Sequence, residues 1–235
     1  MENMNARPKR EVVVPGDLLD DKGLRPGSGT YVLDGKVYSS LLGVKNIRSN
    51  YVNVIPLSGR YLPQTADTVV GKIIDIGPSN WLVDINAPYP APLHVNEVPW
   101  RVEFGDTARF LRVGDVIMAK ILMMDETNKI QVTMNDSGMR KLQGGHVIEI
   151  SYSKVPRVIG KGGSMIQMIK SMTDCRIFVG QNGVIWIEGE LENVLVAAKA
   201  IQMIDEEAQS SNLTERVKEY MEKALPASEQ ADIQE

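Results

Sequence analysis

Three glycines lie within four consecutive positions of this chain and surround one lysine, in the run Gly160-Lys161-Gly162-Gly163. The segment that follows places apolar residues at intervals of three and four, which is typical of an α-helix. Glycine has no Cβ atom, so it adopts backbone angles that other residues avoid and lets a ligand approach the main chain. Free amide groups at the start of a helix attract phosphate. The run therefore predicts a sharp turn into a helix that can hold a phosphate-bearing ligand.

Two common phosphate-binding loops do not fit this spacing. A nucleotide-hydrolysing P-loop places Ser or Thr directly after its lysine, where the hydroxyl reaches Mg²⁺, but Gly162 follows Lys161 here. A dinucleotide-binding fingerprint needs a third glycine at the position that Met165 occupies. The pattern that remains is Gly-x-x-Gly, which also occurs by chance as a plain turn between two helices.

The flanking residues favour the functional interpretation over the plain turn. The stretch VIGKGGSMIQMIK, residues 158–170, resembles the signature of the KH domain. The match continues through two predicted strands, joined at Gln181-Asn182-Gly183, and a predicted helix from Glu190, in the type I order. KH domains clamp about four nucleotides of single-stranded nucleic acid between the glycine turn and an apolar groove. The resemblance implies RNA contact by the turn Gly160 to Gly163 and by Arg157, Ile159, Ser164 and Lys170, with further groove candidates Ile166, Ile169, Ile177 and Val179.

The charge of the chain is distributed unevenly. The net charge is −4, which is unexpected for a nucleic-acid binder. From residue 201 onward, however, 3 basic residues stand against 9 acidic ones, whereas residues 1–200 hold 23 basic and 21 acidic residues. Between Lys154 and Arg176 there are 5 basic residues and 1 acidic residue. The positive charge therefore gathers around the glycines, where it can attract a polyanion.

Two sets of strand-like runs precede the KH-like region. The runs EVVVP, GTYVLD, KVYSSLLGV and YVNVIPL are rich in β-branched residues and separated by Pro, Gly or Asp-Gly turn signals, which predicts a small all-β domain over residues 1–64. The runs TVVGKIIDIG, WLVDIN, GDVIMAKILMMD and KIQVTM, with the proline-broken APYPAPLHV between them, predict a closed five-stranded barrel over residues 65–137. Asp136-Ser137-Gly138 and Gly144-Gly145 are expected to form the linker to the KH-like region, residues 145–208.

The barrel region resembles the S1-type OB-fold in the motifs Val70-Gly71-Lys72-Ile73, Trp81-Leu82-Val83-Asp84 and Leu93-His94-Val95. Such barrels bind single strands through aromatic and basic side chains, and each stacked base contributes about 1–3 kcal/mol. Two alternatives stay open, since Trp81 could equally belong to the barrel core and His94 could be a structural histidine. The RNA-binding candidates of the barrel are Lys72, Trp81, His94, Arg109 and Arg112.

The residues after the KH-like region predict one more helix. It is expected from Leu213 to Leu225, with Asn212 and Glu215 spaced as a capping box, within a C-terminal segment of residues 209–235 that ends in a polar acidic tail. Together the regions predict a multidomain protein, mainly β with α+β: a small N-terminal β domain, an S1-type OB-fold barrel, a type I KH domain and a C-terminal helix.

The order of these regions, with Val13-Val14-Pro15-Gly16-Asp17 and Arg60-Tyr61-Leu62-Pro63, is similar to that of the RNA-binding cap subunits of the archaeal RNA exosome. The resemblance covers nearly the whole chain. It implies a non-catalytic subunit, in three copies or mixed with the other cap subunit, on a hexameric ring of phosphorolytic 3′-to-5′ exoribonuclease subunits. It further implies that the N-terminal domain anchors the cap and that the S1-type and KH domains feed single-stranded RNA toward the pore.

Two other functions are compatible with parts of the sequence. A free-standing RNA chaperone or translation factor could use the same domains, because domain content alone does not fix function. An enzyme is less well supported, because the two histidines form no His-x-x-x-His pair and no nucleophile elbow is present. The single Cys175 cannot build a Cys-rich zinc site, so no cofactor or metal is expected. Without a long apolar run or a signal-peptide pattern, we expect a cytoplasmic protein with no membrane partner.

Overall fold

The computed structural model describes residues 11–20, 23–48, 50–57, 59–124, 129–208 and 212–225. The chain divides into two compact units, one ending at Gly59 and the other beginning at Arg60, and each unit is described by itself. The domain boundaries expected from the sequence at residues 64, 137, 145 and 208 stay predictions. None of the helices within the described ranges is long and apolar enough to cross a membrane.

The N-terminal unit consists of short strands around a small apolar core, and its strand pairs are antiparallel except for β3 with β7, which is parallel. One sheet has the order β1-β6-β7-β3 and the other β2-β5-β4. Asp34 and Gly35, both at positive φ, form the turn between β4 and β5, as expected for an Asp-Gly hairpin. The core contains Val13, Leu19, Val37, Val52 and Val54. The strands are β1 Val12–Val13, β2 Leu18–Asp20, β3 Arg25–Pro26, β4 Thr30–Leu33, β5 Lys36–Ser39, β6 Gly43–Arg48 and β7 Tyr51–Pro56.

The second unit begins with the barrel, whose sheet has the order β12-β10-β9-β8-β11-β13 and closes because β12 also pairs with β11. Irregularities of register at Ile73/Asp75 in β8 and Ile121/Met123 in β11 bend these strands, which helps a sheet curl into a barrel. Its core is lined by apolar side chains from every strand, among them Ile73, Leu93 and Ile117. The strands are β8 Thr68–Ile76, β9 Asn80–Asp84, β10 Ala91–His94, β11 Val116–Met124 and β12 Ile130–Thr133.

The segment expected to be a plain linker contains a strand. Residues Arg140–Leu142 form β13, which pairs with the start of β11, so that Arg140 lies opposite Met118. Its three residues are too few to show a periodic pattern. The connection out of the barrel is therefore tied to the barrel sheet.

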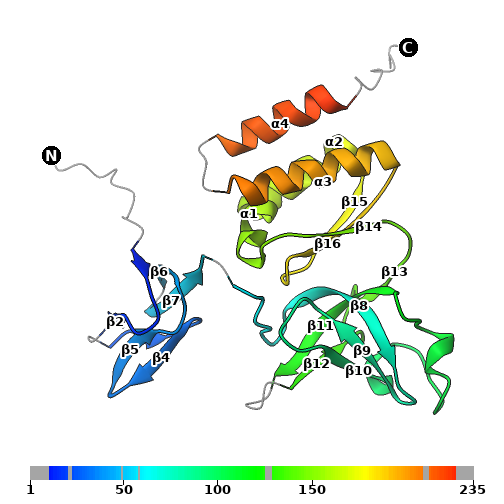
Figure 1. Ribbon diagram of the computed structural model, residues 1–235, viewed down its shortest axis with the longest axis horizontal. Helices are drawn as coiled ribbons and strands as arrows, with labels where there is room; N and C mark the ends of the chain where they lie inside the picture. Colours follow the sequence, from blue (N-terminus) through cyan, green and yellow to red (C-terminus); the bar gives the residue numbers. More distant parts are fainter. Residues whose placement is uncertain are drawn as a thin grey trace. The chain divides into compact units, whose positions relative to one another are not determined.

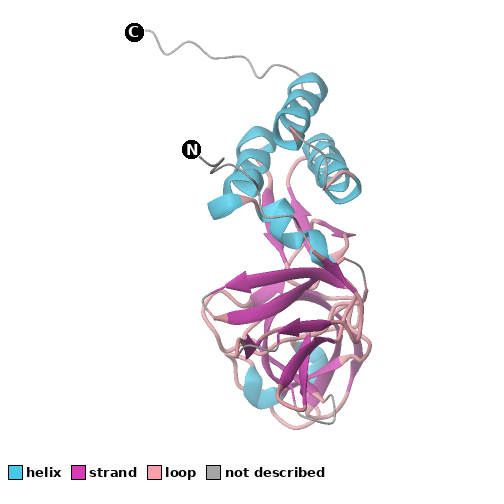
Figure 2. Ribbon diagram, turned by 90° about the vertical axis from the view of Figure 1, so that its left-hand side faces the viewer, coloured by secondary structure: helices cyan, strands magenta, loops and turns pink. Residues whose placement is uncertain are grey.

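The KH-like region has the predicted order of elements, with helices on one face of a three-stranded antiparallel sheet, β14-β16-β15 (Figures 1 and 2). Apolar side chains of the helices meet Ile177, Ile185 and Ile187 of the sheet in one buried cluster. The elements are β14 His146–Glu149, α1 Val155–Ile159, α2 Ser164–Thr173, β15 Arg176–Val179, β16 Val184–Glu188 and α3 Leu191–Glu206.

The opposite face of this sheet packs against the barrel. Val184 and Trp186 of β16 form a buried cluster with Val70 of β8 and Leu142 of β13. The Trp186 indole N–H donates a hydrogen bond of 2.9 Å to the carbonyl of Gly144. The three-stranded sheet is thus covered on both faces, by helices and by the barrel, within one compact unit.

A hairpin turn joins the KH sheet to the barrel by hydrogen bonds. Asn182, in the turn between β15 and β16, is fully buried, and its side-chain amide donates to the carbonyls of Val70 and Ile85 at 2.8 and 2.9 Å. Its side-chain oxygen accepts the Val70 N–H at 3.3 Å. The neighbouring Gln181 exchanges two more bonds with the main chain of Thr68. The turn therefore supplies polar partners to a barrel strand.

The last helix, α4 Leu213–Ala224, packs against α3 through Leu213, Val217 and Met221. The predicted capping box is wrong, because Asn212 adopts left-handed backbone angles and its side chain makes no capping hydrogen bond. The helix is therefore stabilised by the packing of its apolar stripe on the KH core rather than by a side-chain cap.

Replacement of Asn182 should destabilise the second unit strongly. Asn182→Ala leaves three buried main-chain groups of the barrel without partners, so we expect a loss of about 2–4 kcal/mol in the free energy of unfolding. Chemical denaturation followed by circular dichroism measures this loss. The exposed Gln202→Ala on α3 is the control and should change stability by less than about 0.5 kcal/mol. Equal losses of stability for the two substitutions would contradict the role of Asn182 as a hydrogen-bond partner of the barrel.

Candidate nucleic-acid interface

The glycine run forms a tight turn between α1 and α2, as the sequence predicts. Gly160 ends α1 at φ 76°, ψ 177°, a conformation that is essentially restricted to glycine. Gly162 and Gly163 also have positive φ, 61° and 83°. A Cβ atom on Gly160 would lie only 2.8 Å from the Met165 main-chain nitrogen, whereas the space around Gly162 and Gly163 is open. Gly160 therefore shapes the turn, and the other two glycines leave its outer surface bare.

The outer surface of the turn has the electrostatic character of an anion site. The Gly163 and Ser164 N–H groups donate to the carbonyls of Gly160 and Lys161 within the turn. No side-chain hydrogen bond from the described residues caps α2, so the amides left for a ligand are those that follow Ser164 in the first turn of the helix. The partial positive charge of the helix N-terminus acts in the same direction. Lys161 in the turn and Arg157 in α1 are exposed and place two cations beside these amides.

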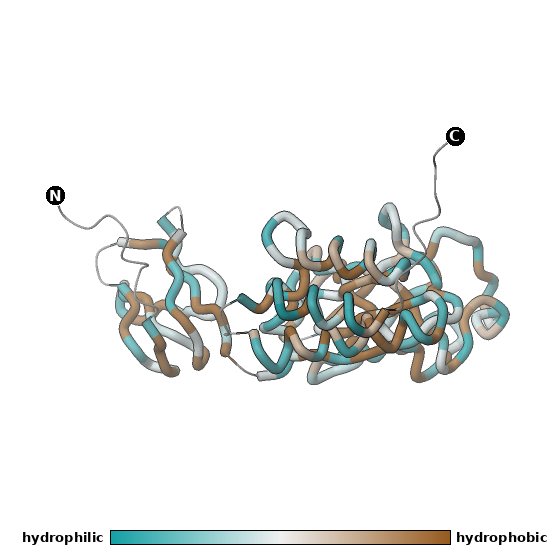
Figure 3. Tube along the Cα trace, turned by 90° about the horizontal axis from the view of Figure 1, so that it is seen from above, coloured by the Kyte–Doolittle hydropathy of each residue, from teal (hydrophilic) through white to brown (hydrophobic). Residues whose placement is uncertain are grey.

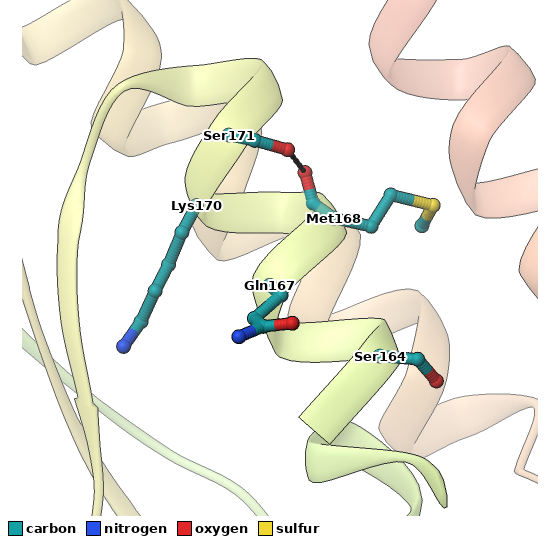
Figure 4. A pocket seen from close by; sticks show the side chains of 5 residues that line it. All are labelled: Ser164, Gln167, Met168, Lys170 and Ser171. Carbon is teal, nitrogen blue, oxygen red and sulfur yellow. Dashed lines mark hydrogen bonds between the residues drawn. The ribbon is translucent and has the colours of Figure 1, made fainter. Parts of the chain in front are cut away.

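The outer face of α2 continues the surface away from the turn. Ser164, Gln167, Met168, Lys170 and Ser171 line a shallow, open depression there (Figure 4). The Lys170 side chain extends to one side of the helix and Met168 to the other, and the Ser171 hydroxyl donates to the Met168 carbonyl at 3.0 Å. These side chains do not converge on an enclosed cavity. The surface suits a strand that lies along the helix better than a small molecule.

The groove candidates divide into core and surface residues. Ile169 and Ile177 are almost completely buried among the helices and the sheet, and Ile166 is nearly so. Ile159 and Val179 are partly exposed at the edge of the same core. Only these last two can offer apolar contact to a ligand without a rearrangement, so the other three belong to the hydrophobic core.

Trp81 does not lie on the barrel surface, and its selection as a base-stacking residue is corrected. Its side chain is fully buried in the barrel core. The indole N–H donates to the carbonyl of Thr107 at 3.3 Å. A base cannot stack on this ring while the barrel is closed. The alternative core interpretation is the one that fits, because Trp81 lies on the inward-facing side of β9 with Val83.

His94 and Arg109 lie at the same end of the barrel, around the turn that joins β8 to β9. Val95, next to His94, donates its N–H to Ser79, and Thr107 donates its hydroxyl to Gly77. His94 is half-buried and its Nδ1 accepts the Asn96 N–H at 3.2 Å, which is a structural role. Arg109 is exposed and forms an ion pair with Asp106 at 2.9 Å.

Phe104 is an aromatic candidate that the sequence reasoning missed. It lies in a loop whose next residue, Gly105, donates its N–H to the Pro78 carbonyl, at the same end of the barrel. Its side chain is 84% exposed, which is unusual for a ring of this size and leaves it free to stack on a base. The segment has no periodic pattern, so the sequence carries little signal that this ring is exposed.

Lys72 and Arg112 lie elsewhere on the barrel, near the middle of β8. There Ile73 exchanges main-chain hydrogen bonds with Gly114 and Asp115. Lys72 is exposed and lines a hollow of about 360 Å³ together with Asp84 of the barrel and Glu149 of β14. The two carboxylates offset the charge of Lys72, so this hollow is a poor site for a polyanion.

Asp115 organises the turn that carries Arg112. Its carboxylate accepts the Arg112 N–H at 2.7 Å and the Lys141 ammonium at 2.5 Å. Partial burial acts to raise the pKa of Asp115, but these two hydrogen bonds outweigh it and hold the pKa below its usual value. Arg112 is thus exposed on a fixed turn, whereas Lys141 is neutralised by its partner.

No arrangement for metal-dependent chemistry occurs within the described ranges. Among these residues no three His, Cys, Asp or Glu side chains gather as a metal site would require. Cys175 is buried beneath α2, and burial raises the pKa of its thiol, which makes the thiolate nucleophile scarce at neutral pH.

The geometry defines an RNA-binding protein built from a KH clamp and an S1-type barrel. Three family profiles match the chain: "Exosome RNA binding protein RRP4 N-terminal domain" over residues 10–58, "RRP4, S1 domain" over 60–105 and "KH domain" over 145–203. The chain belongs to the family of Rrp4 components of the exosome complex.

Relatives along the whole chain agree with this assignment. The exosome complex component Rrp4 of Thermoplasma volcanium is 46% identical over 213 residues, covering 90% of each chain. That of Methanosarcina mazei is 46% identical over 212 residues, covering 90% of this chain and 82% of the relative. A crystal structure of a candidate exosome complex RNA-binding protein superposes with a TM-score of 0.67 at 39% identity, covering 71% of this chain and 97% of that one.

Substitution by alanine should cost more free energy of unfolding at Gly160 than at Gly162. Gly160→Ala places a methyl group against the main chain of Met165 at an angle pair that only glycine adopts readily, and we expect a loss of about 2–4 kcal/mol. Gly162→Ala meets open space and bears only left-handed strain, about 1–2 kcal/mol. Denaturant titrations of the two variants give the comparison. A Gly160→Ala protein as stable as the Gly162→Ala protein would contradict this account of the turn.

Proposed function

We propose that this protein is a non-catalytic cap subunit of an archaeal-type exosome that captures single-stranded RNA in the cytoplasm. In this proposal it delivers the RNA to a hexameric ring of phosphorolytic 3′-to-5′ exoribonuclease subunits, for degradation or processing. Three copies would occupy one ring, alone or mixed with the other cap subunit. The observation that carries the proposal is the bare, positively charged turn of residues 160–163 at the N-terminus of α2, where no side chain from the described residues caps the helix.

The composition of the turn supports binding through the sugar-phosphate backbone. The uncapped amides in the first turn of α2 and the Lys161 ammonium can contact phosphates, and the open space around Gly162 and Gly163 lets the strand lie against the main chain. Backbone contacts position a nucleic acid without reading its bases. We therefore expect weak sequence preference and an affinity that falls with salt. For about four phosphate contacts the log-log salt slope should be roughly −3.

The N-terminal unit supports the anchoring role in this proposal. Its core is small, yet many of its large apolar side chains are exposed, and Figure 3 shows apolar positions repeated along its strands. Val32 and Leu33, near the tip of the β4–β5 hairpin, are 53% and 54% exposed. Exposed apolar groups on so small a domain are typical of a surface that docks onto a partner. We assign this partner as the exoribonuclease ring.

Charge reversal at the turn should weaken RNA capture without unfolding the protein. In the double variant Lys161→Asp/Gly162→Asp, two carboxylates meet the phosphates, and we expect at least a tenfold loss of affinity for single-stranded RNA. Fluorescence anisotropy at two salt concentrations measures the affinity and the slope. The control matched in charge, Thr214→Asp/Lys218→Asp at two exposed positions of α4, lies outside the proposed interface. Undiminished binding by the turn variant would contradict the clamp.

The same variant tests delivery to the ring. A reconstituted exosome should degrade a structured RNA with a single-stranded 3′ tail faster with the wild-type subunit than without it. The charge-reversed subunit should give the rate of the ring alone. No change in rate, processivity or substrate choice upon addition of the wild-type subunit would count against the delivery function, even if RNA binding by the isolated subunit were intact.

Substitutions on the β4–β5 hairpin should release the subunit from the ring. Val32→Asp/Leu33→Asp buries two carboxylates in the proposed contact, so we expect at least a tenfold loss of affinity for the ring, while RNA binding stays unchanged. Gel filtration of the mixed subunits gives the readout. Leu191→Asp/Leu195→Asp, an equally exposed apolar pair on α3, is the control. Coelution of the hairpin variant with the ring would argue against anchoring at this surface.

A further inference from the structure

Two cations from different parts of the second unit meet on one aromatic ring, beyond the end of the clamp. The guanidinium carbon of Arg140, on β13, lies 4.8 Å from the centre of the Phe178 ring, and the Lys170 amine, on α2, lies 6.0 Å from it. Phe178 belongs to β15 and packs against Trp186, with the ring centres 5.6 Å apart. The ring is therefore anchored in the junction between barrel and KH sheet and holds both cations by cation–π contact.

The charges of this pair are not compensated within the described part of the chain. Lys141, the neighbour of Arg140, is neutralised by Asp115, and Arg176 on β15 is neutralised by Glu188. Arg140 and Lys170 form no ion pair with any described carboxylate. Two like charges that share one ring repel each other. An anion that reaches both of them relieves this repulsion, so the pair is suited to bind one.

Lys170 lies farther along the helix that begins at the glycine turn. Lys170 is six positions after Ser164 in the same helix, which corresponds to about 9 Å along its axis. Figure 4 shows the Lys170 side chain extending from the helix toward the neighbouring strand and away from Met168. That strand, β15, is the edge of its sheet. A strand of RNA held at the turn and lying along α2 reaches Lys170 first and Arg140 after it.

We infer that Arg140, with Lys170 and Phe178, forms a phosphate subsite for the nucleotides that follow those held by the KH clamp. Arg140 and Lys170 bind the phosphates, and Phe178 is a positioning residue that holds both cations. Because Arg140 belongs to β13, the strand that leaves the barrel, the subsite extends the RNA path from the KH domain onto the barrel side of the junction. The inference rests on the proposed function, since it assumes that the clamp holds RNA.

Oligonucleotide length distinguishes this subsite from the clamp. A tetranucleotide fills the clamp alone. An octanucleotide whose four additional nucleotides extend toward β13 also reaches Arg140. In the full-length protein, Arg140→Gln should weaken octanucleotide binding about three- to fivefold, the size expected of an exposed ion pair, and should leave tetranucleotide binding unchanged. The salt slope for the octanucleotide should fall in magnitude by about 0.7, the value for one phosphate contact.

Two further variants complete the design. Phe178→Leu keeps both cations and an apolar side chain, and it should reduce octanucleotide affinity by part of the Arg140→Gln effect. Arg216→Gln removes an arginine of α4 that is paired with Glu207, and it should affect neither oligonucleotide. Octanucleotides extended at the 5′ or at the 3′ end should differ in their response to Arg140→Gln, because only one extension points toward β13.

The outcomes separate the two hypotheses. Failure of the wild-type protein to bind either oligonucleotide overturns the clamp and the subsite together. Normal wild-type binding with no effect of Arg140→Gln, or with equal losses for both lengths, overturns the subsite and leaves the clamp intact. A loss confined to the octanucleotide extended at one end, together with the smaller salt slope, supports the subsite.

Discussion

The second unit depends on the side-chain amide of Asn182, which bonds to main-chain groups of Val70 and Ile85 inside the barrel junction. Buried main-chain groups need partners, and here they find them in a hairpin of another domain more than 95 positions away in sequence. Together with the apolar cluster around Trp186, this interaction fixes the KH sheet against the barrel. The glycine turn, the face of α2 and the surface of β13 therefore keep a constant relation to one another.

Electrostatics explains how an acidic chain can present a site for a polyanion. Several cations of the second unit are paired with carboxylates, as Lys120 is with Asp136 and Arg109 with Asp106. The cations along the clamp and at the junction lack such partners within the described residues. Net charge is thus a poor guide to binding here, whereas the local distribution is informative.

The sequence predicted those features that arise from local backbone chemistry or from periodicity. The glycine turn, the Asp34-Gly35 hairpin and the order of elements in the KH region are of this kind, and each is confirmed. The sequence could not tell whether Trp81 faces the core or the surface, because a tryptophan in a strand is compatible with either until the barrel closes. Arg140 and Phe178 are far apart in sequence and unremarkable individually, so their contact emerges only from the packing of the barrel against the KH sheet.

The covering of the KH sheet on its second face determines how this protein can be divided. A fragment cut between the barrel and β14 would present Val184, Trp186 and Phe178 to water, and the barrel left behind would lose the partners of Val70. RNA-binding measurements on the separated domains would therefore include binding to apolar surfaces that are buried in the intact protein. The smallest piece that retains its natural solvent boundary is the barrel, the KH domain and α4 together.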